Sequence, residues 1–206
     1  MQVSNAELCL AGTVCSGPYT GALKSHWTGV RHYGKRGIYG VNRAGRWTPG
    51  MAHVQDVAAY ILRKQGRITA MKLQKLCYFA YGYHLAWEER QLFPERFEAW
   101  ANGPVCRELY AMHRRQLHLD EDSIGGNPDA LDQGEAESVD LMLQAYGRFS
   151  AHQLSEMTHA AGPWVKARAR DKAEALEPSC EPLTDPEIFE FFDALASLDA
   201  DDQERR

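Results

Sequence analysis

The chain has 206 residues, of which 44% are hydrophobic and 25% are charged. This is the composition of an ordinary globular domain, and it excludes wholesale disorder. The net charge of −5 argues against a protein that coats nucleic acid. No apolar run approaches the roughly 20 residues of a membrane-spanning helix, and residues 1–20 have no basic segment before an apolar run. We therefore expect no membrane span and no secretory signal, and the five scattered cysteines then indicate reduced thiols of a cytoplasmic protein.

The first 50 residues differ from the rest of the chain. They contain six Lys or Arg, one acid and nine of the 17 glycines, whereas residues 51–206 have a net charge of −10. A segment with so much glycine and no sustained periodicity cannot bury enough apolar surface to form a core. Two interpretations of this basic, Gly-rich extension stay open: a start site assigned too far upstream, with Met51 the true initiator, or a tail that binds a partner or nucleic acid. We expect a folded domain over 51–198 and a solvated tail over 199–206.

Helical periodicity begins directly after residue 51. Apolar residues recur at helical spacing from Val54 to Leu62, and Gly66 is a suitable C-cap. Thr69 can cap the next helix, whose apolar residues lie around most of its circumference. A helix of this kind usually lies in the middle of a bundle. The predicted fold class is therefore mainly α, a compact helical bundle around a central apolar helix of about 71–89.

The later segments predict further helices and little strand. Residues 91–101 indicate a turn and at most a short strand pair near 97–101. Gly103 and Pro104 predict the start of a helix, because proline is well tolerated in the first turn. An acidic loop is expected over 119–134. Helices are then expected over about 135–148, over about 150–162, from Pro163 onward, and from Thr184 to about residue 198.

Catalytic signatures are absent from the sequence, which has no GxSxG, P-loop, GxGxxG or HExxH motif. The candidate zinc ligands are Cys9, Cys15, His26 and His32. Their spacing is irregular and no CxxC occurs, so we expect no metal site. Cys77 and His84 are seven residues apart, as are Cys106 and His113, and two helical turns separate such a pair by ~10 Å, too far for a thiolate–imidazole pair. A pairing between helices stays open, but we expect core residues here, no enzyme and no cofactor.

Aromatic residues are concentrated between positions 78 and 100, which hold eight of the 21 in the chain. One helix cannot bury so many rings in a small bundle, so we expect some Tyr and Trp side chains on the surface, where they are good interface anchors. The partner-binding residues that we predict on the 71–89 helix are Gln74, Lys75, Tyr78 and Tyr81. Trp100 and Trp164 lie close to Gly-Pro steps, and we expect both rings to be largely buried.

Two sets of motifs carry a family resemblance. The first comprises Lys72-Leu73-Gln74-Lys75-Leu76, Tyr78, Tyr83-His84-Leu85, Phe97-Glu98-Ala99-Trp100, Gly103-Pro104-Val105 and Leu109-Tyr110. The second comprises Leu154-Ser155-Glu156-Met157-Thr158-His159, Pro163-Trp164 and Ala167-Arg168. Over about 52–198 this pattern resembles the Panacea domain, also called the SocA-like or phage-associated GepA-like antitoxin family. The sequence departs from the family at Cys77, where an aliphatic residue is frequent, and in the longer acidic insert over 119–134.

The resemblance implies a compact helical domain that acts as the antitoxin of a toxin–antitoxin system and neutralises a cognate toxin by direct protein–protein binding. Partners of similar proteins include small alarmone synthetase-like toxins, and one family branch is a proteolytic adaptor that delivers its toxin to ClpXP. An alternative is a phage-associated enzyme with an unrecognised site. The resemblance also implies structural roles for Trp100, Gly103, Pro104, His159, Pro163 and Trp164. Membrane and nucleic-acid partners are not expected.

Overall fold

The computed structural model describes residues 51–174 and 177–204, so the predictions made for residues 1–50 and for the zinc ligands within them lie outside the described part of the chain. The helices are α1 (Val54–Gln65), α2 (Ala70–Glu88), α3 (Arg107–His113), α4 (Gln133–Tyr146), α5 (Ala151–Ala160), α6 (Pro163–Asp171) and α7 (Asp185–Glu204), with a short 3-10 helix at Glu121–Ser123. The strands are β1 (Ile68–Thr69), β2 (Phe97–Glu98), β3 (Val105–Cys106) and β4 (His118–Leu119). The mainly α prediction is confirmed. None of the described helices is long and apolar enough to cross a membrane.

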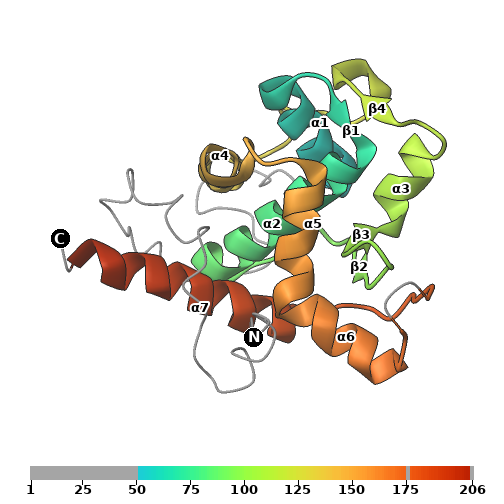
Figure 1. The fold of residues 1–206 in the computed structure, drawn as a ribbon. Coiled ribbons are helices and arrows are strands. Elements are labelled where there is room, and N and C mark those ends of the chain that lie inside the picture. The colour runs from blue at the N-terminus through green and yellow to red at the C-terminus, as the bar shows by residue number, and fades with distance from the viewer. Residues whose placement is uncertain (1–50, 175–176, 205–206) are drawn as a thin grey trace.

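Helix α2 lies in the middle of the molecule, as its all-round apolar sequence predicted. It contacts α1, α4, α5 and α7, and Figure 1 shows these helices arranged around it. Every residue from Leu73 to Leu85 is buried, including the polar ones. The surrounding helices and short strands therefore bury the whole circumference of α2 along most of its length.

The helix ends follow the predicted capping signals. The Thr69 hydroxyl accepts a hydrogen bond from the backbone N–H of Lys72 at 3.2 Å, and Gly66 ends α1 with a left-handed φ of 67°. Ser150 and Gln153 form the predicted reciprocal capping box of α5. Pro163 is the first residue of α6, where its missing N–H costs nothing. Helix α7 continues to Glu204, beyond the end predicted near residue 198.

The short strands differ in part from the prediction. Strands β2 and β3 pair antiparallel with Phe97 opposite Cys106, close to the predicted pair. A second pair, β1 with β4, was not predicted, because strands of two residues carry no readable periodicity. The prediction that Gly103 and Pro104 begin a helix is wrong: the chain first forms β3, and α3 begins only at Arg107.

Six of the eight aromatic residues between positions 78 and 100 are buried, among them all three tyrosines, and Trp87 and Trp100 are partly buried. The expectation that tyrosines of this group would surface is therefore wrong. Helix α7 brings Phe192 against the rings of Tyr78, Phe79 and Tyr83, with centroids 5.5, 5.9 and 4.9 Å away. The contact is close because Gly82 has no side chain: a β-carbon there would lie 2.2 Å from the Phe192 ring. Helix α7 thus buries aromatic rings of α2 that α2 could not bury by itself.

Candidate functional site

The two sets of sequence motifs meet at one place in the fold, the hairpin of β2 and β3 with its connecting loop (residues 97–106). Five buried residues hold this hairpin through its backbone, and we call them the hairpin clamp: Gln74, Lys75, Ser155, Trp164 and Arg168. The bonds are Arg168 Nη1 to Ala99 O at 3.0 Å, Trp164 Nε1 to Trp100 O at 2.8 Å, Ser155 Oγ to Asn102 O at 2.8 Å, Lys75 Nζ to Pro104 O at 2.8 Å and Gln74 Nε2 to Cys106 O at 3.2 Å. A carbonyl withdrawn from water needs such a partner, so the clamp fixes the path of the hairpin.

Gln74 and Lys75 come from α2 and are 3% and 1% exposed. The expectation that they lie on the surface is wrong, because the hairpin and α5 cover this side of α2. The Gln74 amide also accepts a bond from the Cys106 N–H at 2.9 Å, so it pairs with that residue as a neighbouring strand would. These two polar residues thus bind the backbone of the chain itself.

Lys75 is a buried amine beside a tight glycine. Burial lowers its pKa to about 7. Gly103 has a left-handed φ of 98°, and a β-carbon on it would lie 2.8 Å from Lys75 Nζ and 2.7 Å from Thr158 Oγ1. Only glycine combines that backbone conformation with so close an approach. This explains why Gly103-Pro104 belongs to the motif although it begins no helix.

His159 and Trp164 stack at the outer side of the clamp, with ring centroids 4.0 Å apart and planes 18° from parallel. Burial lowers the pKa of His159, and the nearby cations Lys75 and Arg168 lower it further. Trp164 is 8% exposed, so its predicted burial is confirmed. Trp100 is only half-buried: its Nε1 donates to Glu98 Oε2 at 2.7 Å.

Tyr78 and Tyr81, the other two predicted partner-binding residues, are each 2% exposed. Tyr81 donates its hydroxyl proton to Asp185 Oδ1 at 2.8 Å, which ties α2 to the start of α7. Burial raises the pKa of both phenols well above the ordinary value. The expectation that these tyrosines face solvent is therefore wrong, since α7 and the hairpin pack against them.

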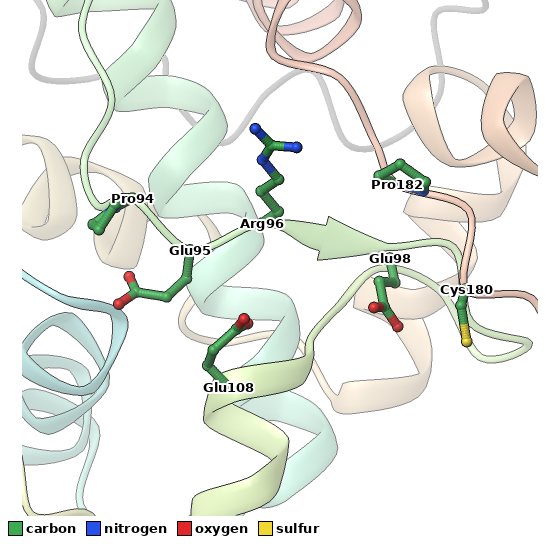
Figure 2. A pocket seen from close by; sticks show the side chains of 7 residues that line it. All are labelled: Pro94, Glu95, Arg96, Glu98, Glu108, Cys180 and Pro182. Atoms are coloured by element: carbon green, nitrogen blue, oxygen red, sulfur yellow. The ribbon is translucent and has the colours of Figure 1, made fainter.

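A surface pocket lies on the other side of the hairpin. Its lining comprises Pro94, Glu95, Arg96, Glu98, Glu108, Cys180 and Pro182. In Figure 2 the Arg96 side chain extends away from the three glutamates. Glu95 is already engaged, accepting bonds from His53 Nδ1 at 2.7 Å and from the Val54 N–H at 3.0 Å. Within the described residues no group of His, Cys, Asp and Glu has the arrangement of a metal site. The pocket offers three carboxylates and the Cys180 thiol, and no hydrogen bond joins that thiol to a carboxylate or an imidazole among the described residues, as an activated nucleophile would need.

Cys77 and His84 of α2 and Cys106 of β3 are core residues, as predicted. Cys77, Cys106 and His84 are fully buried. His84 Nδ1 forms a hydrogen bond of 2.9 Å with Ser138 Oγ, and burial lowers its pKa to about 3, so the ring is neutral. His113 Nε2 lies 3.0 Å from Gln74 Nε2. No bond joins a described thiol to an imidazole, and neither histidine has the geometry of a base for a cysteine nucleophile.

Sequence reasoning gave no role to Ser155 and Arg168, although both stand in the second motif. Arg168 is 5% exposed, and besides Ala99 it binds the carbonyl oxygens of Glu174 and Glu177. A signal was present, since Arg168 follows Trp164 by four residues and therefore lies on the same face of a short helix as that tryptophan. Its partners could not be read, because they are backbone atoms distant in the sequence.

Comparison with known proteins gives one family match and one curated relative. Residues 73–165, which contain four of the five clamp residues, match the family described as Antitoxin SocA-like, Panacea domain. The chain is 34% identical over 110 residues to Antitoxin SocA of Caulobacter vibrioides (strain NA1000 / CB15N), and the match covers 47% of this chain and 58% of that relative. No solved structure matches the chain. Residues 73–165 are thus similar to the SocA-like Panacea domain family, and the match spans only 58% of the length of the curated relative.

Proposed function

We propose that this chain is an antitoxin that neutralises a cognate toxin by direct protein–protein contact in the cytoplasm. The observation that carries the proposal is its similarity to Antitoxin SocA. The family match spans the residues that build the hairpin and most of its clamp.

The chemistry of the clamp supports a binding role. Its polar groups donate hydrogen bonds to backbone carbonyl groups. Its charged residues, Lys75 and Arg168, are buried in the interior and do not line an open cavity. A binding protein needs a fixed surface and no turnover, and buried polar networks serve that need by specifying one conformation. We propose that Gln74, Lys75, Tyr78 and Tyr81 act on the partner through the shape of the surface above them.

A co-expression growth assay tests the proposal. The gene next to this one is expressed alone and then with the full chain, and we expect it to be lethal alone and tolerated in the pair. The toxin is then purified with the chain from the rescued cells. Failure of the chain to restore growth with the neighbouring gene, and to recover a toxic protein by pull-down, would contradict the proposal.

Repeating the assay in cells without ClpXP separates two mechanisms. Direct neutralisation predicts rescue with the toxin still present in the cell. Rescue that needs ClpXP and is accompanied by loss of the toxin would instead identify a proteolytic adaptor.

A further inference from the structure

We infer that residues 112–118, the tip between α3 and β4, dock on the partner protein, and that the partner presents there an acidic patch around an apolar pocket. This inference rests on the proposed function, because it names the surface of the same antitoxin. The sequence of the tip is Met-His-Arg-Arg-Gln-Leu-His.

The tip exposes apolar side chains that the fold does not use. Leu117 is 72% exposed and Met112 is 42% exposed, and Val165 of α6 is the other large hydrophobic residue exposed within the described chain. Single exposed apolar residues are common. Two of them lie within seven residues, whereas the other large apolar side chains of the described core, apart from Val165, are buried or partly buried. This concentration indicates a contact surface.

The tip is also basic, and its arginines lack ion-pair partners. Arg114 and Arg115 are exposed, and neither forms an ion pair within residues 51–174 and 177–204. Arg67 has the same property and stands directly before β1, which pairs with β4 at the base of the tip. By contrast, Arg63, Arg90 and Arg170 each have a carboxylate partner at 2.9 Å or less.

The nearby acids form no ion pair with the tip arginines. Asp120 follows β4, and its carboxylate accepts a bond from the Ser123 hydroxyl at 2.6 Å. Glu121 and Asp122 lie in the next turn, in the 3-10 helix. No described carboxylate lies within ion-pair distance of Arg114 or Arg115, so both guanidinium groups are available to a partner.

The backbone holds the tip in one conformation. Arg115 has a left-handed φ of 72°, which costs a residue with a large side chain on the order of 1 kcal/mol. The turn is fixed by a bond from the Gln116 N–H to His113 O at 2.9 Å and from the Ala70 N–H to Leu117 O at 3.0 Å. Leu117 is therefore presented on a rigid support, and its docking loses little conformational entropy.

Charge complementarity decides the kind of partner. The tip has two arginines, two histidines and no acid, whereas residues 51–206 have a net charge of −10. An acidic patch on a partner is attracted to the tip and repelled by the net negative charge of the rest of residues 51–206, which favours one orientation of binding on this part of the chain. Nucleic acid is disfavoured as a partner, because the net charge of −5 repels phosphates and the apolar side chain of Leu117 cannot bind them.

The test compares tip variants with matched controls in binding to the toxic protein recovered from the co-expression assay. The variants are Leu117→Ser and the double change Arg114→Glu with Arg115→Glu. The controls are Val165→Ser, an exposed apolar residue of α6, and Arg96→Glu, an exposed arginine that forms no ion pair within the described chain and lines the pocket of Figure 2. We expect each tip variant to weaken the complex about thirtyfold and each control to change it less than threefold. The charge reversal is also expected to remove most of the salt dependence of binding.

The outcomes separate the inference from the proposed function. If the unchanged chain binds and rescues while both tip variants do the same with unaltered affinity, the inference is wrong and the function stands. Loss of binding with Arg96→Glu and not with the tip variants would place the interface at the pocket. The last experiment measures binding of fluorescent RNA and DNA oligonucleotides. If these bind in a way that depends on Arg114 and Arg115, while toxin binding is unchanged in the charge-reversed variant, the tip binds nucleic acid and the inference is wrong. Circular dichroism of each variant confirms that it is folded.

Discussion

Gly82 of α2 and Phe192 of α7 approach so closely that a β-carbon on Gly82 would lie 2.2 Å from the Phe192 ring. No real β-carbon is tolerated at that distance, and the ring is held by three aromatic neighbours on α2. The spacing of the two helices therefore depends on the absence of a side chain at one position.

Gly82→Ala should destabilise the chain, because overpacking forces either α7 or the Phe192 ring to move. We expect a loss of about 1–3 kcal/mol in the free energy of unfolding, measured by urea denaturation. Phe192→Leu should recover part of that loss in the double variant, although it is destabilising by itself. Gly125→Ala is the control, since no atom lies within 4 Å of the position that its new β-carbon would occupy. Additive effects of the changes at 82 and 192 would contradict the proposed contact.

Gly103→Ala should be more damaging than Gly66→Ala, although both glycines have a left-handed φ. At Gly66 the β-carbon would meet open space, so only backbone strain of about 1 kcal/mol is expected. At Gly103 the same strain adds to a clash with Lys75 and Thr158. Thermal melting of both variants measures the difference, and equal melting temperatures would show that the clamp does not depend on this approach.

Lys75 should make the stability of the fold rise with pH just above neutrality. Its pKa is lowered to about 7 in the folded chain and returns to about 10.5 on unfolding, so between these values the unfolded chain binds more protons. Stability is then lowest below pH 7 and should increase by about 1.5 kcal/mol between pH 7 and 8.5. This window lies below the ordinary pKa of the buried thiols and phenols, whose contributions have the opposite sign.

Lys75→Met isolates this effect, because it keeps the aliphatic stem and removes the titrating amine. We expect urea denaturation of the variant to show a flatter pH dependence over the same window. Lys166→Met is the control, since Lys166 is exposed and pairs with Glu190 at 2.9 Å. An unchanged slope in Lys75→Met would mean that the amine is not desolvated in the folded chain.

The two motif tryptophans should differ in their contribution to stability. Trp164 is buried, stacks on His159 and donates to the hairpin backbone, so Trp164→Ala should cost about 3–5 kcal/mol. Trp100 is half-buried and its ring meets the Tyr110 ring edge-on at 4.9 Å, so Trp100→Ala should cost less. Calorimetric melting compares the two. A Trp164→Ala chain with an unchanged melting temperature would contradict the clamp geometry.

The sequence predicted the helices better than the site, for a physical reason. Helix boundaries depend on local chemistry, and the caps at Gly66, Thr69, Ser150 and Pro163 all formed where that chemistry indicated. The orientation of α2 could not be predicted, because a helix that is apolar on every side has no polar face to show which side is exposed to solvent. Gln74 and Lys75 therefore resembled surface residues.

Those two side chains are buried against a segment of the chain about 30 residues further along, and they bind its backbone carbonyl groups. The Lys75 bond to Pro104 and the Gln74 bonds to Cys106 span 29 and 32 residues. No periodicity reports such a pairing. Gly103-Pro104 was misinterpreted for the same reason. Glycine is required at position 103 because Lys75 of α2 and Thr158 of α5 lie so close to it, and not because a helix begins there.

The cysteines should be dispensable for neutralisation if the chain acts by contact alone. Cys77 and Cys106 are fully buried, and burial raises the pKa of Cys77 and raises that of Cys106 to about 12, so both are protonated and unreactive at neutral pH. Cys180 is exposed, and no described histidine bonds to it. The triple variant Cys77→Ala, Cys106→Ala and Cys180→Ala should therefore rescue growth as well as the unchanged chain. Its free energy of unfolding should fall modestly, because the two core sites lose volume. The measurement pairs the growth assay with circular dichroism. A triple variant that is fully folded but no longer rescues would show that a thiol takes part in the activity, and an enzymatic mechanism would then replace the binding one.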